Sequence, residues 1–149
     1  GYKFATERSQ HLMSLGIPLN TDSTLKGQTV FLAERCGELM YDNIITDRTI
    51  LDVMAFTLNA KSIPHQDKDA FEVYASEFIR EYDYIFYISP HGIEIEDNGI
   101  RETDEHYRDL IDFTITTLIK RHGHKAGKIE KISGSTEERI QQILNITSL

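Results

Sequence analysis

The sequence predicts an α/β fold in three layers, α/β/α, in which helices cover both faces of a mostly parallel sheet. Stretches typical of strands alternate with stretches typical of amphipathic helices along the chain. Residues 84–88 (YIFYI) form an almost unbroken apolar and aromatic run, which is typical of a strand covered on both faces. Charged and polar residues follow the predicted strands directly, at the edge where open α/β sheets bind ligands.

The expected elements follow from local patterns. Apolar runs predict strands at 2–6, 44–45, 84–88 and, more weakly, 128–132. Apolar residues at steps of three and four predict helices over 24–41, 50–60, 70–82 and 104–122, with a shorter helix over 11–15. Thr103 is the expected N-cap of the helix that runs to 122, and Ser135 with Glu138 predicts a capping box at the last helix. Residues 61–69 and 91–103 are expected to be loops.

Composition excludes several classes of protein. At 149 residues the chain is the size of one domain, and 40% hydrophobic with 27% charged residues is typical of a globular protein. A formal net charge of −8 argues against general nucleic-acid binding, which needs a basic face. Cys36 is the only cysteine, so an intrachain disulfide is impossible. Neither a membrane-spanning run nor a signal peptide is visible, and we expect a cytoplasmic protein.

The pair Asp47-Arg48 is the principal candidate for chemistry. It follows the strand at 44–45 and precedes a predicted helix, so an acid and a base lie together at the carboxyl end of a strand. A carboxylate there can hold a hydrated Mg²⁺, and a guanidinium can clamp a phosphate with two parallel hydrogen bonds. The alternative interpretation is that Asp47 caps the following helix beside a solvated Arg48.

Similar residues follow the other predicted strands. Glu7 and Arg8 come after the first strand, and Ser133-Gly134-Ser135 comes after the last. In the acidic loop, Glu94 and Glu96 alternate on one side of an extended segment, where they could share a divalent ion as in a metal-dependent nuclease. The alternative for that loop is a solvated edge.

Four segments together resemble a known family. They are DRTILDVMAF (47–56), YDYIFYISP (82–90), DNGIRETDEHYRDLID (97–112) and ISGSTEERIQQIL (132–144). In order and spacing they resemble the P-loop kinase superfamily, and more narrowly the small ATPase/kinase family typified by the nicotinamide-riboside kinase domain of a bacterial NAD regulator. The resemblance covers nearly the whole chain. It implies a nucleoside-kinase-like fold and an ATP- and Mg²⁺-dependent phosphotransferase acting on a nucleoside, nucleotide or related small metabolite.

The resemblance also implies roles for individual residues. Asp47 would hold Mg²⁺ or orient the acceptor, and Arg48 would clamp the substrate. Glu7 would serve as general base or fix the acceptor hydroxyl, with Arg8 beside it among the substrate-binding residues. Substrate specificity would come from the helix 24–41, where Gln28 and Arg35 are the candidates.

A lid segment, about 91–108, is implied as well. Arg101 resembles the lid arginine that closes over a transferring phosphoryl group, where it would stabilise the spreading negative charge. Arg108 either assists in nucleotide binding or pairs with Asp104 or Asp112 on its own helix. Gly134 and Ser135 either lie against the adenine or form a turn followed by a helix cap.

One part of the family pattern is absent. The sequence contains no G-x-x-x-x-G-K-[ST] loop, the Walker A motif whose backbone amides cradle phosphates, and the strand that leads into it in the family is absent too. That strand lies in the middle of the family's sheet, so a chain without it would leave two strand edges and an apolar slot unfilled. We therefore expect residues 1–149 to be the carboxyl-terminal bulk of a longer kinase domain, with weak or no ATP binding of their own.

Two alternatives to a truncated kinase stay open. Another chain could supply the absent part, in keeping with a possible homo-oligomer. Alternatively, the fold could work without nucleotide, as a non-catalytic α/β interaction module. An ATPase of the same superfamily without a small-molecule acceptor would use the same residues.

Overall fold

The structure is a computed structural model that describes residues 1–6, 8–91 and 104–149. Its helices and strands alternate in the order predicted, with short 3-10 turns at Asn20–Asp22, Glu77–Glu81 and Gly123–Lys125. The main elements are β1 (Lys3–Ala5), α1 (Ser9–Ser14), α2 (Leu25–Glu38), β2 (Ile44–Thr46), α3 (Ile50–Asn59), α4 (His65–Ser76), β3 (Tyr84–Ile88), α5 (Glu105–His122), β4 (Lys128–Ile132) and α6 (Thr136–Thr147). The mixed α/β class is therefore confirmed.

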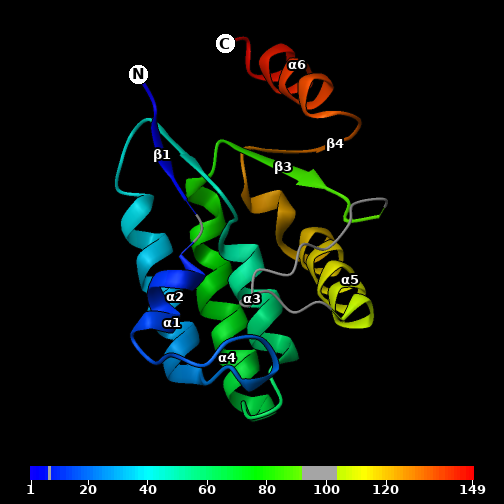
Figure 1. Ribbon diagram of the computed structural model, residues 1–149. Coiled ribbons are helices and arrows are strands. Elements are labelled where there is room, and N and C mark those ends of the chain that lie inside the picture. Colours follow the sequence, from blue (N-terminus) through cyan, green and yellow to red (C-terminus); the bar gives the residue numbers. More distant parts are fainter. Residues whose placement is uncertain (7, 92–103) are drawn as a thin grey trace.

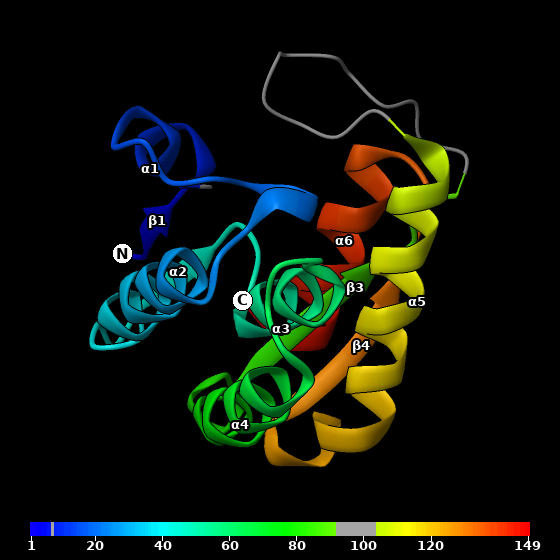
Figure 2. The same ribbon diagram turned by 90° about the horizontal axis from the view of Figure 1, so that it is seen from below.

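The strands are parallel, but they do not form the one sheet that was expected. In the described part of the chain, β1 pairs with β2 and β3 pairs with β4, and no strand pairing joins the two sheets. The register aligns Phe4 with Ile45 in the first sheet and Phe86 with Glu130 in the second. The break falls in the middle of the four strands, between β2 and β3 (Figures 1 and 2).

Helices lie on both sides of the strands but cover them unequally. Figure 1 shows α2, α3, α4 and α5 on one side and α6 alone on the other. Figure 2, seen from the helical side, shows α3 at the centre of that layer, where it contacts α2, α4 and α5. The apolar core accordingly centres on α3, whose side chains Ile50, Met54 and Ala55 are fully buried.

The start of α3 shows whether Asp47 is the N-cap of that helix. Thr49 is the N-cap, its hydroxyl accepts a hydrogen bond from Leu51 N, and the Asp52 carboxylate accepts one from Thr49 N. This capping box satisfies helix donors that would otherwise lack partners. The interpretation of Asp47 as the helix cap is therefore wrong.

Several boundaries and exposures differ from the predictions. The predicted loop 61–69 is shorter, because α4 begins at His65 directly after Pro64, whose φ of −61° suits a helix entrance. The N-cap of α5 is Asp104 rather than Thr103, since the Asp104 carboxylate accepts from His106 N. Strand β3 was expected to be covered on both faces, yet Tyr84 and Ile88 are exposed because α6 alone lies on that side. None of the described helices is both long and apolar enough to cross a bilayer.

Candidate functional site

The turn after β2 presents Asp47 and Arg48 in a fixed conformation. Asp47 N donates to Ala5 O at 2.9 Å, so the backbone still follows β1, while the Asp47 side chain is exposed. Arg48 then has φ of +75°, in the left-handed region that is unfavourable for a side chain with a Cβ. The Thr46 hydroxyl donates a hydrogen bond to Arg48 O at 2.8 Å and stabilises this turn. An unfavourable backbone held in this way is typical of functional positions.

The Arg48 side chain lies against the ring of Phe56 on α3. Its guanidinium carbon lies 5.5 Å from the centre of the Phe56 ring, within the range of a cation–π interaction. Phe56 in turn lies 6.5 Å, between ring centres, from Tyr107 in the first turns of α5. Through Phe56, Arg48 is thus connected indirectly to α5, the helix that carries Arg108.

A second polar group lies at the carboxyl end of β3. The Tyr87 hydroxyl donates to Asp112 Oδ1 at 2.5 Å, and His91 Nε2 lies 4.0 Å from Asp112 Oδ2. Burial, and then the Asp112 carboxylate, raise the pKa of Tyr87 to about 12, so this phenol stays protonated at neutral pH. Asp112 follows Arg108 by one helical turn, which places both on the same side of α5.

Sequence reasoning missed this second group. Tyr87 was counted as part of an apolar strand, and Asp112 was considered only as a partner for Arg108. One signal was available, because a strand residue that carries a hydroxyl near the carboxyl end can face the helix that follows. The end of β3 thus contacts α5 through Tyr87 and Asp112. Arg48, at the end of β2, contacts Phe56 of α3, whose ring lies near Tyr107 of α5.

The helix α2 carries the predicted specificity residues on its buried side. Gln28 is buried, and Arg35 at 3% exposure pairs with Glu38 at 6%, with Arg35 Nη1 at 2.8 Å from Glu38 Oε2. Arg8 Nε lies 3.6 Å from Glu38 Oε1 and keeps much of its side chain in solvent. The structure thus brings Arg8 and Arg35 together around one carboxylate. Their role in substrate binding stays a prediction, and Arg8 is the more accessible of the two.

The turn after β4 is closed by its own side chains. Glu138 Oε2 accepts from Ser135 N at 2.7 Å, and the Ser135 hydroxyl accepts from Glu138 N, as the predicted capping box requires. Gln142 accepts from Ser133 N and donates to Ser133 O. Gly134 has φ of +97°, and a Cβ there would come within 2.1 Å of Glu138 Oε2. The turn-and-cap alternative describes this loop, and a nucleotide contact at Gly134 or Ser135 stays a prediction.

Four predicted features lie wholly or largely outside the described residues. Glu7 and Arg101 are among them, as are the acidic residues Glu94 and Glu96 and most of the lid segment. Arg108 is described, and its Nε lies 3.7 Å from Asp109 Oδ1.

The described residues suit the two implied cofactors unequally. Mg²⁺ commonly keeps several waters and binds one or two carboxylates together with substrate phosphates, and the exposed Asp47 carboxylate fits that mode. No group of three or more His, Cys, Asp or Glu side chains among the described residues is placed to hold a metal by itself. ATP fits poorly, because these residues contain no glycine-rich phosphate loop. The backbone N–H of Ser135, which could otherwise bind a phosphate, already donates its hydrogen bond to the Glu138 carboxylate.

Comparison with known proteins gave no relative. No family model matches the chain, and no curated protein or solved structure matches it either. Function therefore has to be argued from the geometry of the site.

Proposed function

We propose that the carboxyl ends of β2 and β3 form the acceptor side of a Mg²⁺-dependent phosphotransferase. The substrate would be a nucleoside, a nucleotide or a related small metabolite. The observation that carries the proposal is the turn at 46–49. In this turn the backbone of Arg48 has a left-handed conformation, held by the Thr46 hydroxyl, and the Asp47 carboxylate beside it is exposed. Two parallel strand pairs with helices on both sides support a finer proposal, that the fold is of the nucleoside-kinase type with three layers.

Each residue would contribute a separate interaction. Arg48 would bind a phosphate or a pair of hydroxyls through its planar guanidinium, which the Phe56 ring helps to hold in place. Asp47 would bind Mg²⁺ through water, and the metal when bound would neutralise phosphate charge. Tyr87, protonated at neutral pH and held by Asp112, would border the site at the next strand.

The phosphoryl donor is the part that these residues do not accommodate. Positioning and charge neutralisation supply most of the rate in phosphoryl transfer, so an acceptor side without a phosphate cradle would bind ligands but turn over weakly. This is why the test of the proposal is binding rather than activity.

A second function is favoured by a different observation. In the part of the chain that the structure describes, the two sheets are not paired with each other, and apolar side chains of β1, β2 and β3 are exposed. These features suit a non-catalytic module that binds another polypeptide. That function would leave Asp47 and Arg48 without a ligand, so the two proposals give different results in one experiment.

The experiment is a titration of isotope-labelled residues 1–149 with AMP in the presence of Mg²⁺, followed by amide chemical shifts. We expect saturable shifts at residues 46–49 in the millimolar range, which is typical of an incomplete site. Adenosine without phosphate should produce much smaller shifts. Arg48→Ala should remove the response, whereas Arg121→Ala, which breaks a surface contact with Glu72, should preserve it.

The proposal has a clear failing result. If AMP, GMP, CMP and UMP with Mg²⁺ all leave residues 46–49 unshifted at millimolar concentration, this turn is not a phosphate site. Shifts that persist in Arg48→Ala would likewise place the ligand elsewhere.

A further inference from the structure

Arg8 and Arg48 follow two strands that are paired with each other. The register aligns Ala5 of β1 with Thr46 of β2, and Asp47 N donates to Ala5 O at 2.9 Å. The turn after β2 therefore begins alongside the end of β1. Arg8 comes three residues after Ala5, which limits the distance between their Cα atoms to about 11 Å. Each of the two paired strands is thus followed closely by an arginine at the same end of the sheet.

The buried carboxylate of Glu38 lies next to Arg8. Only 6% of Glu38 is exposed, and its Oε2 accepts a hydrogen bond from Arg35 Nη1 at 2.8 Å. Its Oε1 is buried as well and has no hydrogen-bond partner in the described part of the chain. Arg8 Nε lies 3.6 Å from this second oxygen, a separation that suits an ion pair and is too long for a hydrogen bond. Because a buried charge is costly when it is incompletely compensated, Glu38 attracts the Arg8 guanidinium and restricts its position.

The contact with Glu38 leaves the terminal nitrogens of Arg8 available. A guanidinium carries one N–H on Nε and four on its two terminal nitrogens. Nε is the nitrogen paired with Glu38, and no other ion pair among the described residues involves Arg8. Since 46% of the Arg8 side chain is exposed, a ligand in solvent can reach it. Two terminal nitrogens that donate in parallel are the donors with which an arginine binds two oxygens of one phosphate.

The same carboxylate also acts near the start of α3. The Tyr82 hydroxyl accepts a hydrogen bond from Ile50 N, two residues after Arg48. Burial raises the pKa of the Tyr82 phenol, and the charges of Arg35 and Glu38 act on it as well. The buried pair on α2 is therefore near the start of α3 as well as the end of β1, and the turn that carries Arg48 adjoins both.

The charges around this turn indicate the charge of the ligand. Arg35 and Glu38 neutralise each other, and no salt bridge among the described residues involves Arg48. Arg8 and Arg48 thus remain as two cations in excess, while the exposed Asp47 carboxylate is assigned to Mg²⁺ by the proposed function. A phosphate monoester carries about two negative charges at neutral pH, whereas a phosphodiester carries one. Two guanidiniums therefore favour the monoester.

From these observations we infer that Glu38 is a positioning residue, which holds the Arg8 guanidinium so that its terminal nitrogens, together with Arg48, bind a phosphate monoester dianion. Glu38 itself touches no ligand, and Arg35 keeps its carboxylate in place. The inference rests on the proposed function. It narrows the ligand of that site from nucleosides and nucleotides to compounds with a terminal phosphate.

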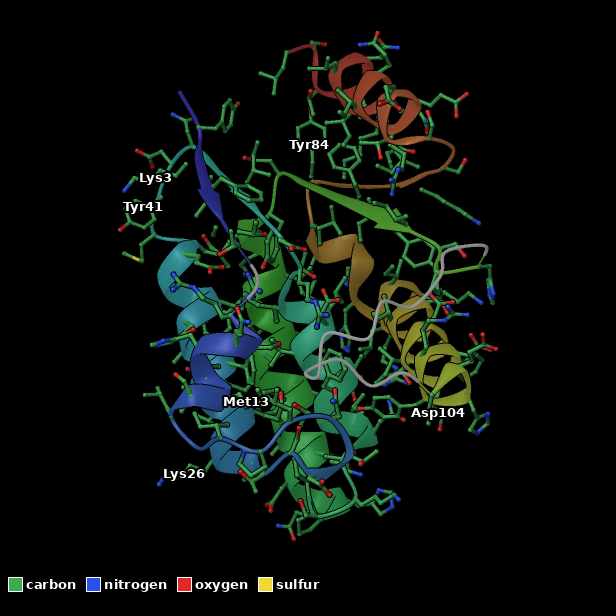
Figure 3. All side chains as sticks on the ribbon, in the orientation of Figure 1. Lys3, Met13, Lys26, Tyr41, Tyr84 and Asp104 are labelled. Carbon is green, nitrogen blue, oxygen red and sulfur yellow. The ribbon has the colours of Figure 1, made fainter. Side chains whose placement is uncertain are left out.

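The test extends the amide titration with AMP and Mg²⁺ to cyclic AMP, which keeps the base and the sugar but has a phosphodiester. We expect the unaltered protein to bind AMP about tenfold or more tightly than cyclic AMP. Arg8→Gln should remove most of this preference. Lys3→Gln removes the same charge from the opposite end of β1, where Lys3 Nζ lies 3.5 Å from the centre of the Tyr41 ring (Figure 3), and should keep the preference.

Variants without the buried carboxylate test positioning. Arg35→Leu with Glu38→Leu changes neither the net charge nor Arg8, and apolar replacement of a whole buried pair is commonly tolerated. It should weaken AMP binding several-fold and shift the Arg8 Nε–H resonance. Glu38→Gln should weaken AMP binding too, although its added positive charge alone would favour AMP. In an Arg8→Gln background the α2 double substitution should change the affinity little, because Glu38 acts only through Arg8.

Two results would overturn the inference and leave the proposed function standing. The first is a response to AMP at residues 46–49 with the same affinity in Arg8→Gln as in the unaltered protein. The second is equal weakening by the α2 double substitution with and without Arg8, which would mean that the pair acts through the fold. Absence of any response to nucleotides at 46–49 in the unaltered protein would instead contradict the proposed function, and this inference with it.

Discussion

The hydroxyl of Tyr82 accepts a hydrogen bond from Ile50 N at 3.2 Å and thereby links the start of α3 to the segment that leads into β3. Ile50 is in the first turn of its helix, where a backbone N–H has no partner within the helix. The bond therefore satisfies a buried donor and connects the β1–β2 half of the strands to the β3–β4 half. Burial also raises the pKa of the Tyr82 phenol, which keeps the hydroxyl neutral.

Tyr82→Phe should lower the free energy of unfolding by about 1–3 kcal/mol, because it leaves the Ile50 N–H buried without an acceptor. Chemical denaturation measures the change. Tyr84→Phe, at an exposed position two residues further on, is the matched control and should have little effect. Equal stabilities of the two variants would show that the bond contributes nothing.

The buried pair on α2 gives a second prediction. Arg35→Leu alone should destabilise the protein by about 3–5 kcal/mol, since the Glu38 carboxylate is left buried without its main partner. Arg35→Leu with Glu38→Leu should recover most of that loss. Arg8→Ala, which removes only the more exposed cation at 3.6 Å, should cost under about 1 kcal/mol. A double variant no more stable than the single one would contradict this account.

Two substitutions of Arg48 separate the effect of its left-handed backbone on stability from the effect of its guanidinium on ligand binding. Arg48→Gly should be more stable than Arg48→Ala by about 1 kcal/mol, because glycine adopts φ of +75° without a Cβ clash. Both variants lose the guanidinium and should therefore lose the response to AMP equally. Thermal unfolding and the amide titration measure the two effects. If the Arg48→Ala variant were as stable as the Arg48→Gly variant, the left-handed turn would not be retained in solution.

Tyr87 contributes, together with the buried Tyr82, to the loss of stability at alkaline pH. Its pKa is raised from 10.0 to about 12, so the folded state holds the phenol proton more tightly than the unfolded chain does. The resulting stabilisation is complete below pH 10 and is lost as the pH rises toward 12. Denaturation curves across this range should fall less steeply for Tyr87→Phe than for the unaltered protein. Tyr74→Phe, on the exposed side of α4, should follow the unaltered protein.

The loop after β4 gives a prediction about α6. Gly134→Ala should displace Glu138 and break the capping box, because the new Cβ would meet the carboxylate and φ is +97°. Loss of a cap lowers helix stability by about 1 kcal/mol. Hydrogen exchange of the first amides of α6 should therefore become faster. Ser133→Ala keeps the backbone bonds to Gln142 and is the control. Unchanged exchange in Gly134→Ala would show that another cap replaces Glu138.

The sequence was sufficient for features that depend on neighbouring residues. The strands at 44–45 and 84–88, the helix from Ile50 and the Ser135–Glu138 cap all follow from local spacing. The structure has each of them, with the first of these strands extended to Thr46. Asp47 and Arg48 stood out because chemistry after a strand is a local signal as well. The left-handed conformation of Arg48 could not be foreseen, since no glycine or asparagine marks it.

Contacts between residues that are far apart in the sequence could not be predicted from local patterns. Tyr87 and Asp112 are 25 positions apart, and each has an ordinary explanation within its own element. Arg35 and Glu38 were missed as a buried pair because charged residues on a helix are normally assigned to solvent. Here α2 directs a partly polar side toward α3, which only the packing of the two helices reveals.

Gly127 has a consequence for any search for functional positions in this chain. A Cβ on this residue would lie 2.5 Å from the backbone oxygen of Asp83, so every other amino acid would push β4 away from β3. In a complete library of single substitutions, position 127 would therefore score as intolerant as a catalytic residue. It lies at the amino end of β4, opposite the edge that carries Asp47 and Arg48. Mutational intolerance will identify the site only where abundance of folded protein is scored beside ligand binding.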